Sequence, residues 1–486
     1  MGDNVDRETY DEADHLRFAD RLDRSLAALR ELLRRPGFGV GPTTIGAELE
    51  LSLVGENGRP LPINQAVRDT LPQVALEIGR FNVELNLRPQ RLAGRPFVAF
   101  RDELQDEMER LRKAVTTHHG RVLAIGTLPT LREDELGVET LSDDSRYRAL
   151  DAAVRQLRGR PLALQVAGVD RLTTQLAHVT AEAANTSWQV HLRVRPDRFA
   201  AVYNAAQLAT APVLAASVNS PFLFGHRLWE ETRIALFEQI TDDRAAHEAG
   251  DPARHRVGFG DDWLRGDAAD LFERTVRQYP PMLPVLSESD PLEEVARGEV
   301  PALSELRLHV GTVWWWNRPV YDPAGGGHLR VELRALPSGP SVPDMLANAA
   351  FLLGLTLAAA HDSPRLSFAE ARRGFYAAAR DGLDAELTWP FPDPVTMPAR
   401  ELVPRLLPEA RRGLDEAGVD SALSDELLDL IGARVATGQT GSAWQRRAFD
   451  VLERRRGDRD TALAALVDHY HAASWSGRPV HTWPDP

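Results

Sequence analysis

The segment TIGAELELSLV at residues 44–54 decides the fold class of this chain. Apolar and polar side chains alternate strictly along it: the apolar set is Leu49, Leu51 and Leu53, and the polar set is Glu48, Glu50 and Ser52. Because successive side chains of a β-strand point to opposite faces of the sheet, this period predicts a strand with one apolar and one polar face. An ordinary half-solvated strand gives the same pattern, so this strand alone does not locate a site.

Three further segments, at 81–87, 188–195 and 328–336, repeat the alternation. Their polar sides carry Asn82, Glu84 and Asn86, then Gln189, His191, Arg193 and Arg195, then Arg330, Glu332 and Arg334. Carboxylates gathered on one sheet face repel one another unless a cation lies among them, and Mg²⁺ prefers oxygen ligands. The four strands together predict a concave sheet face on which acidic side chains hold divalent cations.

The rest of the pattern is mostly helical and indicates that helices flank this sheet. Helices are predicted at 10–35, 97–119, 197–217 and from 343 onward, and a further strand at 305–316. We expect three parts: an N-terminal helical extension (1–40), a catalytic domain (41–385) and a C-terminal helical region (386–486) packed on the same domain.

Composition excludes several kinds of chemistry. The chain has no cysteine and a single lysine, Lys113, which rules out thiolate nucleophiles and disulfides and leaves phosphate binding to arginine, metal or backbone amides. A net charge of −14 disfavours nucleic acid or an anionic membrane as a partner. The first twenty residues are acidic where a signal peptide would be basic and then apolar, so we expect a cytoplasmic protein.

Short motifs along the chain follow a fixed order. They are GAELE at 46–50, Glu77 and Glu84 around the second strand, IGTLP at 125–129, RYR at 146–148, SWQVH at 187–191, NSP at 219–221, RP at 318–319 and VELR at 331–334. In this order they resemble the bacterial glutamate–cysteine ligases and their carboxylate–amine ligase relatives, over roughly residues 44–385. The resemblance implies an α+β fold like that of glutamine synthetase and the guanidino kinases, with an antiparallel β-sheet that forms a concave active site and is flanked by helices.

The resemblance also implies roles for particular residues. The metal ligands would be Glu48, Glu50, Glu77, Glu84, His191 and Glu332, binding Mg²⁺. Arg334 and Arg233 would be catalytic, Arg330 and Arg334 would contact the phosphates of ATP, and Arg146 and Tyr147 would belong to the substrate pocket. The partners would be small amino-acid or amine substrates, and the C-terminal helices would either cap the sheet or form a homodimer surface.

The expected reaction is ATP-dependent formation of an amide through an acyl phosphate. Two alternatives stay open: phosphotransfer to a guanidino group on the same fold, and a non-catalytic relative that binds nucleotide. Three positions depart from the family pattern, Arg80 between the two acids, Leu128 in place of a histidine, and Pro337 in place of an acid. The run Trp314–Trp316 either packs in the core, stacks on an adenine or lines a substrate pocket, and alternation of faces places at least one ring in the core.

Overall fold

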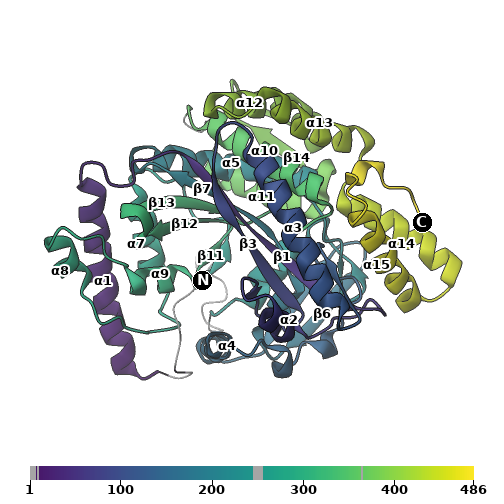
Figure 1. The fold of residues 1–486 in the computed structure, drawn as a ribbon, viewed down its shortest axis with the longest axis horizontal. Coiled ribbons are helices and arrows are strands. Elements are labelled where there is room, and N and C mark those ends of the chain that lie inside the picture. The colour runs from purple at the N-terminus through teal and green to yellow at the C-terminus, as the bar shows by residue number, and fades with distance from the viewer. Residues whose placement is uncertain (1–6, 8–9, 245–254, 363–364) are drawn as a thin grey trace.

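The structure is a computed structural model that describes residues 7, 10–244, 255–362 and 365–486 (Figure 1). At its centre lies a seven-stranded antiparallel sheet in the order β12-β13-β7-β1-β3-β2, with β4 beside one end of β1. Its strands are β1 (Thr44–Gly55), β2 (Ala75–Leu76), β3 (Asn82–Arg91), β4 (Gly120–Leu123), β7 (Trp188–Val194), β12 (Asn317–Asp322) and β13 (His328–Leu333). The predicted α+β class, with an antiparallel sheet flanked by helices, is confirmed.

The register of the central strands brings the polar stripes together. Glu50 lies directly opposite Glu84 on β3, while His191 on β7 lies directly opposite Glu332 on β13. On the other side of the sheet, Leu49 and the other apolar side chains of β1 are fully buried. Strand alternation therefore separates an apolar core face from a face on which charged groups accumulate.

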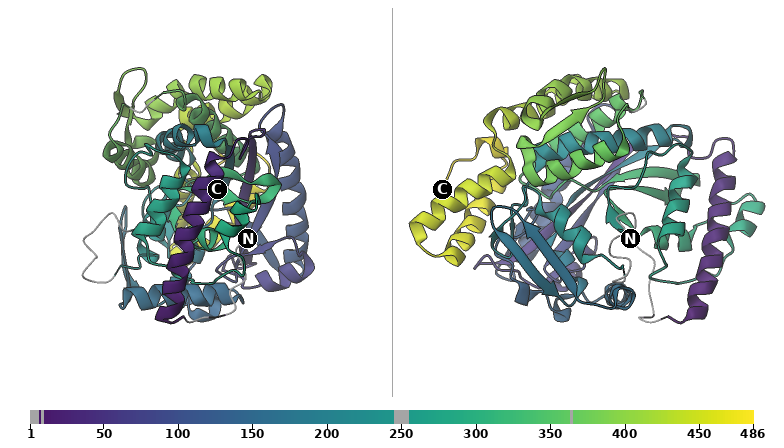
Figure 2. Two further views of the ribbon diagram at one scale, coloured as in Figure 1. Left: turned by 90° about the vertical axis from the view of Figure 1, so that its left-hand side faces the viewer. Right: turned by 180° about the vertical axis from the view of Figure 1, so that it is seen from behind.

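Three long helices cover the apolar face: α3 (Pro96–Thr116), α5 (Phe199–Ser217) and α10 (Val342–Ala359). Helix α3 contacts β3 and β4, α5 contacts β12 and β13, and α10 contacts β7 (Figure 2). Two segments, Pro196–Ser217 and Val342–Ala359, are long and apolar enough to span a membrane, but 83% of each lies buried inside the fold. Burial on all sides accounts for their composition, because a core helix needs no polar face.

The polar face is overlaid by shorter elements, which are α4 (Ser145–Arg158), α6 (Thr232–Ile240), α9 (Ser304–Val310) and the 3₁₀ segment Val179–Ala184. At one end of the molecule, α1 (Glu12–Arg34) packs against α7 (Ala268–Gln278), α8 (Pro291–Ala296) and α9 (Figure 1). The minor elements are α2 (Asn64–Thr70), the hairpins β5 (Leu162–Ala167) with β6 (Arg171–Leu176) and β8 (Phe222–Leu223) with β9 (His226–Arg227), and the pair β10 (Val257–Gly258) and β11 (Trp314–Trp315).

The strand predicted at 305–316 is wrong: this segment forms helix α9 followed by the short strand β11. The polar side chains that gave it an alternating pattern are not on a solvated face. Glu305 accepts a hydrogen bond from the backbone N–H of Ser287 at 2.8 Å, and Nε2 of the buried His309 lies 3.0 Å from the carbonyl oxygen of Thr275. These long-range bonds stabilise a helix that the local period does not reveal.

The C-terminal part adds α11 (Phe368–Asp381), the hairpin β14 (Glu386–Trp389) and β15 (Val395–Pro398), α12 (Ala399–Ala417), α13 (Ser421–Thr437), α14 (Gly441–Arg456) and α15 (Arg459–Ser474). Helices α14 and α15 lie at the end of the molecule opposite α1 (Figures 1 and 2). The buried Tyr470 of α15 donates a hydrogen bond to the carbonyl of Ala124 just after β4, and buried Arg434 forms an ion pair with Asp344 at 2.8 Å. The C-terminal helices thus share one hydrophobic core with the sheet.

Candidate active site

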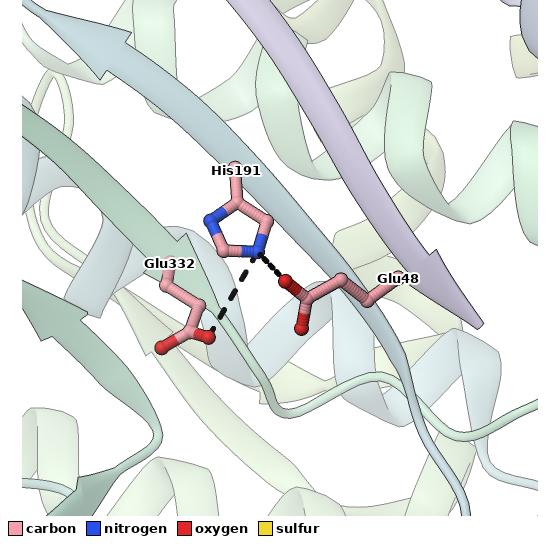
Figure 3. Close-up of side chains that lie close together, drawn as sticks. All are labelled: Glu48, His191 and Glu332. Atoms are coloured by element: carbon pink, nitrogen blue, oxygen red, sulfur yellow. Dashed lines mark ion pairs between the residues drawn. The ribbon is translucent and has the colours of Figure 1, made fainter. Parts of the chain in front are cut away.

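One group of candidate metal ligands lies where β1, β7 and β13 run side by side (Figure 3). Nε2 of His191 is 3.1 Å from a carboxylate oxygen of Glu48 and 3.8 Å from one of Glu332. Nδ1 of this buried ring has no hydrogen-bond partner among the residues that the structure describes, and Nε2 faces the two carboxylates. The group therefore offers two carboxylates and an imidazole nitrogen that are within reach of one ion.

A second group contains Glu50, Glu77 and Glu84, whose nearest carboxylate oxygens lie within 4.8 Å of one another. Glu50 and Glu84 face each other across β1 and β3, and Glu77 follows β2 in the chain. Asn86 donates a hydrogen bond to Glu84 at 2.7 Å. The two groups bring together all six side chains that the resemblance marks as metal ligands.

Glu50 is held in position by two residues at the start of β7, Ser187 just before the strand and Gln189 within it. One carboxylate oxygen accepts from the backbone N–H of Ser187 and the other from the side-chain amide of Gln189, both at 2.7 Å. The amide oxygen of Gln189 in turn accepts from the guanidinium of Arg334 at 2.5 Å. Gln189 thus links the second acidic group to the arginine that follows β13.

The second group carries more negative charge than its surroundings compensate. Burial, together with the charges of the nearby Glu48 and Glu50, raises the pKa of Glu84 to about 8. Burial, followed by the charges of Glu84 and Glu50, holds the pKa of Glu77 well above its usual range. In the protein alone Glu84 therefore keeps its proton at neutral pH, and a cation bound in this group would favour the ionised form of these carboxylates.

Glu332 in the first group has the opposite character. Burial opposes its ionisation, but the guanidinium groups of Arg318 and Arg334 and the His191 ring outweigh burial and hold its pKa below the usual range. Two guanidinium nitrogens of Arg318 donate hydrogen bonds to the carboxylate, and the bond from Nη2 is 2.9 Å long. Nη1 of Arg334 lies 3.2 Å from the same carboxylate. The structure thus holds Glu332 as a carboxylate in a rigid, charge-balanced position.

Two cavities open on the polar face, and both contact Glu48, Arg146, Gly311, Arg318 and Glu332. The narrow cavity, of about 210 Å³, is lined with arginine: its basic residues are Arg146, Arg307, Arg318, Arg330 and His191. The wide cavity, of about 440 Å³, contains the second acidic group and, away from it, a wall of apolar and aromatic side chains. Glu48 and Glu332 of the first ligand group therefore line both cavities, and the second ligand group lies in the wide cavity.

The predicted arginines occupy different positions. Arg334 lines the wide cavity, and Arg330 lines the narrow one, where it pairs with Asp322 at 2.6 Å. Arg233 is buried behind the site, 3.1 Å from the carboxylate of Glu231, and it lines neither cavity.

Arg146 and Tyr147, the two predicted substrate residues, both line the wide cavity from α4. The Tyr147 hydroxyl donates a hydrogen bond to the carbonyl of Leu76 at 2.9 Å, and burial raises its pKa well above the usual range. Tyr147 therefore presents its ring, as a neutral phenol, to the cavity.

Two departures from the family pattern do not reach the acidic cluster. Arg80 is exposed, and its Nε donates to the carbonyl of Leu141 at 2.8 Å. Leu128 is buried in the core, and the nearby His118 and His119 are exposed beyond the end of α3, where they cannot replace a histidine in the site.

Sequence reasoning missed one acidic residue of the site, Glu182. It lies in the 3₁₀ segment Val179–Ala184 and lines the wide cavity, and burial, with a further contribution from the charge of Glu50, raises its pKa to about 8. Its surroundings, AEAAN, show no strand period and no motif that could have identified it. Sequence reasoning identified Arg318 only as part of a motif and gave it no role. Its hydrogen bonds to Glu332 follow from the pairing of β12 with β13, which places the two residues opposite each other.

The donor set fits a hard divalent cation. The second group offers only carboxylate oxygens, and the first adds one imidazole whose Nε2 faces two carboxylates. Mg²⁺ and Mn²⁺ accept oxygen-rich sets of this kind, whereas structural zinc sites rely on cysteine, which this chain lacks.

Comparisons with known proteins show the fold and the family of this chain. No curated protein sequence gives a significant match. Among solved structures, glutamate–cysteine ligase from Francisella tularensis, in complex with AMP, is similar over 92% of this chain and 91% of its own, with a TM-score of 0.56 at 11% identity. A bifunctional glutathione synthetase from Pasteurella multocida matches over 95% of this chain and 55% of its own, with a TM-score of 0.47 at 12% identity.

The first of these structures shows the fold alone, and the family assignment comes from the sequence. The model of glutamate-cysteine ligase family 2 (GCS2) matches residues 44–469, which include every strand of the central sheet and both groups of candidate metal ligands. The chain therefore belongs to glutamate-cysteine ligase family 2, a family of ligases that form carbon–nitrogen bonds.

Proposed function

We propose that this protein is an ATP- and Mg²⁺-dependent ligase, similar to glutamate–cysteine ligase, that joins a carboxylate to an amine through an acyl phosphate. One observation carries the proposal. Six candidate ligand side chains from distant parts of the chain converge in two groups on one sheet face; Glu48 and Glu332 of the first group line both cavities, and the second group lies in the wide cavity. This arrangement can bind a polyphosphate and an organic substrate on either side of the same ions.

The reaction requires a poor leaving group to be replaced by a good one. An oxygen of the substrate carboxylate attacks the γ-phosphorus of ATP, the bond to the β-phosphate oxygen breaks, and ADP leaves. The amine then attacks the carbonyl carbon, phosphate departs, and the amine nitrogen loses its extra proton. In sum, carboxylate, amine and ATP give amide, ADP and phosphate.

The protein contributes positioning and charge in this scheme. Arg330 and Arg318 in the narrow cavity would contact the nucleotide phosphates, while Arg334, held by Gln189 and Glu332, would face the transferring phosphoryl group. Arg233, buried and paired with Glu231, would act on the charge of Glu50 from behind the site.

The divalent ions would be held by the two carboxylate groups and His191, and Mg²⁺ bound there would neutralise phosphate charge and polarise the reacting oxygens. No serine, thiol or lysine nucleophile is needed, which agrees with a chain that has no cysteine and one lysine. We also propose a cytoplasmic location, a three-part organisation (1–40, 41–385 and 386–486) and a homodimer as predictions from the sequence.

Release of ADP from Mg-ATP in the presence of paired amino acids and amines, with products identified by mass spectrometry, tests the proposal. We expect ADP, phosphate and an amide in equal amounts with at least one pair. ADP formed only with a guanidino acceptor, together with a phosphorylated guanidine, would favour the phosphotransferase. Binding of ATP by calorimetry with no turnover for any pair would instead identify a non-catalytic relative.

A further inference from the structure

The wide cavity contains more apolar wall than a small polar substrate would use. Beyond the acidic group it is lined by Leu150 and Val154 of α4, Val179 of the 3₁₀ segment, Phe237 of α6 and Trp314 of β11. At about 440 Å³ it lies within the range of pockets that enclose ligands larger than a simple amino acid. An apolar recess of this kind binds apolar groups by removing them from water.

The aromatic part of this wall is fixed by its packing. The ring centroids of Phe237 and Trp314 are 6.0 Å apart, and Phe237 also lies 5.9 Å from the buried Trp316. The other two tryptophans of the run are buried, but Trp314 is only half-buried and contacts the cavity. Its indole therefore offers a preformed surface for stacking a flat or bulky apolar group.

Arg146 supplies a charged contact at the junction of the two cavities. Its guanidinium makes no hydrogen bond or ion pair to any residue that the structure describes, although the side chain is only half-exposed. An arginine that is not paired with a protein carboxylate can bind the carboxylate of a ligand with two parallel hydrogen bonds.

The narrow cavity lacks the tryptophan and phenylalanine wall formed by Trp314 and Phe237, and it contains Arg307, Arg330 and the whole first ligand group, Glu48, His191 and Glu332. A triphosphate suits that side, which leaves the wide cavity for the organic substrates. The aromatic wall then faces the amine acceptor rather than the nucleotide base.

We propose that the amine acceptor is an α-amino acid with an aromatic or large apolar side chain, which packs on Trp314 and Phe237 while Arg146 binds its carboxylate. This inference rests on the proposed function and adds the class of the acceptor to it. Cysteine, the substrate in the name of the family, would leave the aromatic end of the cavity unfilled.

The test compares kcat/KM for phenylalanine, leucine, alanine and cysteine as acceptors, using Mg-ATP and glutamate, in the wild type and in Trp314→Ala. We expect a higher kcat/KM for phenylalanine or leucine than for alanine and cysteine. Trp314→Ala should lower kcat/KM for phenylalanine on the order of 10-fold and should change kcat/KM for alanine little. The matched control is Trp263→Ala, which removes an equally half-buried tryptophan that lines neither cavity. Trp314→Phe should restore much of the preference.

A second comparison isolates Arg146. Arg146→Ala should lower kcat/KM for phenylalanine but not for phenethylamine, which has the same ring and no carboxylate. Equal or better use of cysteine by the wild type would overturn the inference while leaving the proposed ligase intact. A raised KM for ATP in Trp314→Ala, equal for all acceptors, would overturn it by assigning the indole to adenine.

Binding of phenylalanine without ATP, measured by calorimetry, separates the two proposals. If no acceptor supports ADP release, the proposed function fails, and the pocket is still judged by whether phenylalanine binds to the wild type and not to Trp314→Ala. Absence of that binding would contradict the inference on its own.

Discussion

Replacing Glu84 by glutamine should stabilise the metal-free protein and at the same time remove its response to Mg²⁺. The substitution keeps the shape of the side chain and an oxygen that can accept the hydrogen bond from Asn86. It makes the side chain permanently neutral in a group in which three carboxylates approach within 4.8 Å, so the folded chain no longer has to hold a proton that the unfolded chain releases. A site built to hold a cation is strained without it, so stability and function should change in opposite directions.

The size of the effect follows from the titration of Glu84. Burial, with Glu48 and Glu50, raises its pKa from 4.5 to about 8 in the folded protein. Between these values the unfolded chain has lost the proton that the folded chain keeps, so the free energy of unfolding falls as pH rises. From pH 4.5 to pH 7, at about 1.4 kcal/mol per unit, the loss is about 3 kcal/mol. Water reaches part of this half-buried carboxylate, so this value is an upper limit.

Urea unfolding at pH 7 in EDTA and in excess Mg²⁺ measures both effects. Glu84→Gln should be more stable than the wild type in EDTA by up to about 3 kcal/mol, should gain little from Mg²⁺, and should release no ADP. Glu109→Gln, an exposed change on α3, is the control and should leave the Mg²⁺ effect unchanged. A glutamine variant that is less stable in EDTA, or that gains as much from Mg²⁺ as the wild type, would refute the reasoning.

Three further predictions address other parts of the site. Glu332→Gln should lower the rate of ADP release by at least 10²–10³-fold, roughly the effect of losing one preorganised electrostatic contact, with the helical circular dichroism unchanged; full turnover would exclude Glu332 as a ligand. His191→Ala should raise the Mg²⁺ concentration needed for half-maximal activity, and an unaltered Mg²⁺ titration would argue against a ligand role. Arg80→Ala should leave the Mg²⁺ titration unchanged, because Arg80 faces the Leu141 carbonyl and not the acidic group; a shifted titration would contradict that placement.

The central sheet could be predicted from the sequence because its information is local. Each polar stripe alternates with leucine or valine over six or more residues, as in β1 and β13, and a period of two fixes which side chains share a face. The pairing of Glu50 with Glu84 and of His191 with Glu332 could not be derived from periodicity, because register depends on contacts between distant strands. The resemblance marked all six residues as metal ligands, and the structure divides them into two groups.

The elements over the polar face were harder to predict. Residues 304–310 form a helix held by bonds of Glu305 and His309 to distant segments, although their local pattern alternates like a strand. Glu182 enters the cavity from a short 3₁₀ segment with no periodic signal. Residues that complete a cavity from irregular segments are determined by tertiary packing, and a single sequence does not contain that information in local form.

The most direct test of the central claim is a crystal structure of the protein with Mn²⁺ and a non-hydrolysable ATP analogue, recorded at the manganese absorption edge. We expect anomalous peaks at both ligand groups, one bounded by Glu48, His191 and Glu332 and the other by Glu50, Glu77 and Glu84, with the triphosphate beside them. A well-ordered nucleotide bound elsewhere, with no anomalous peak at either group, would contradict the account.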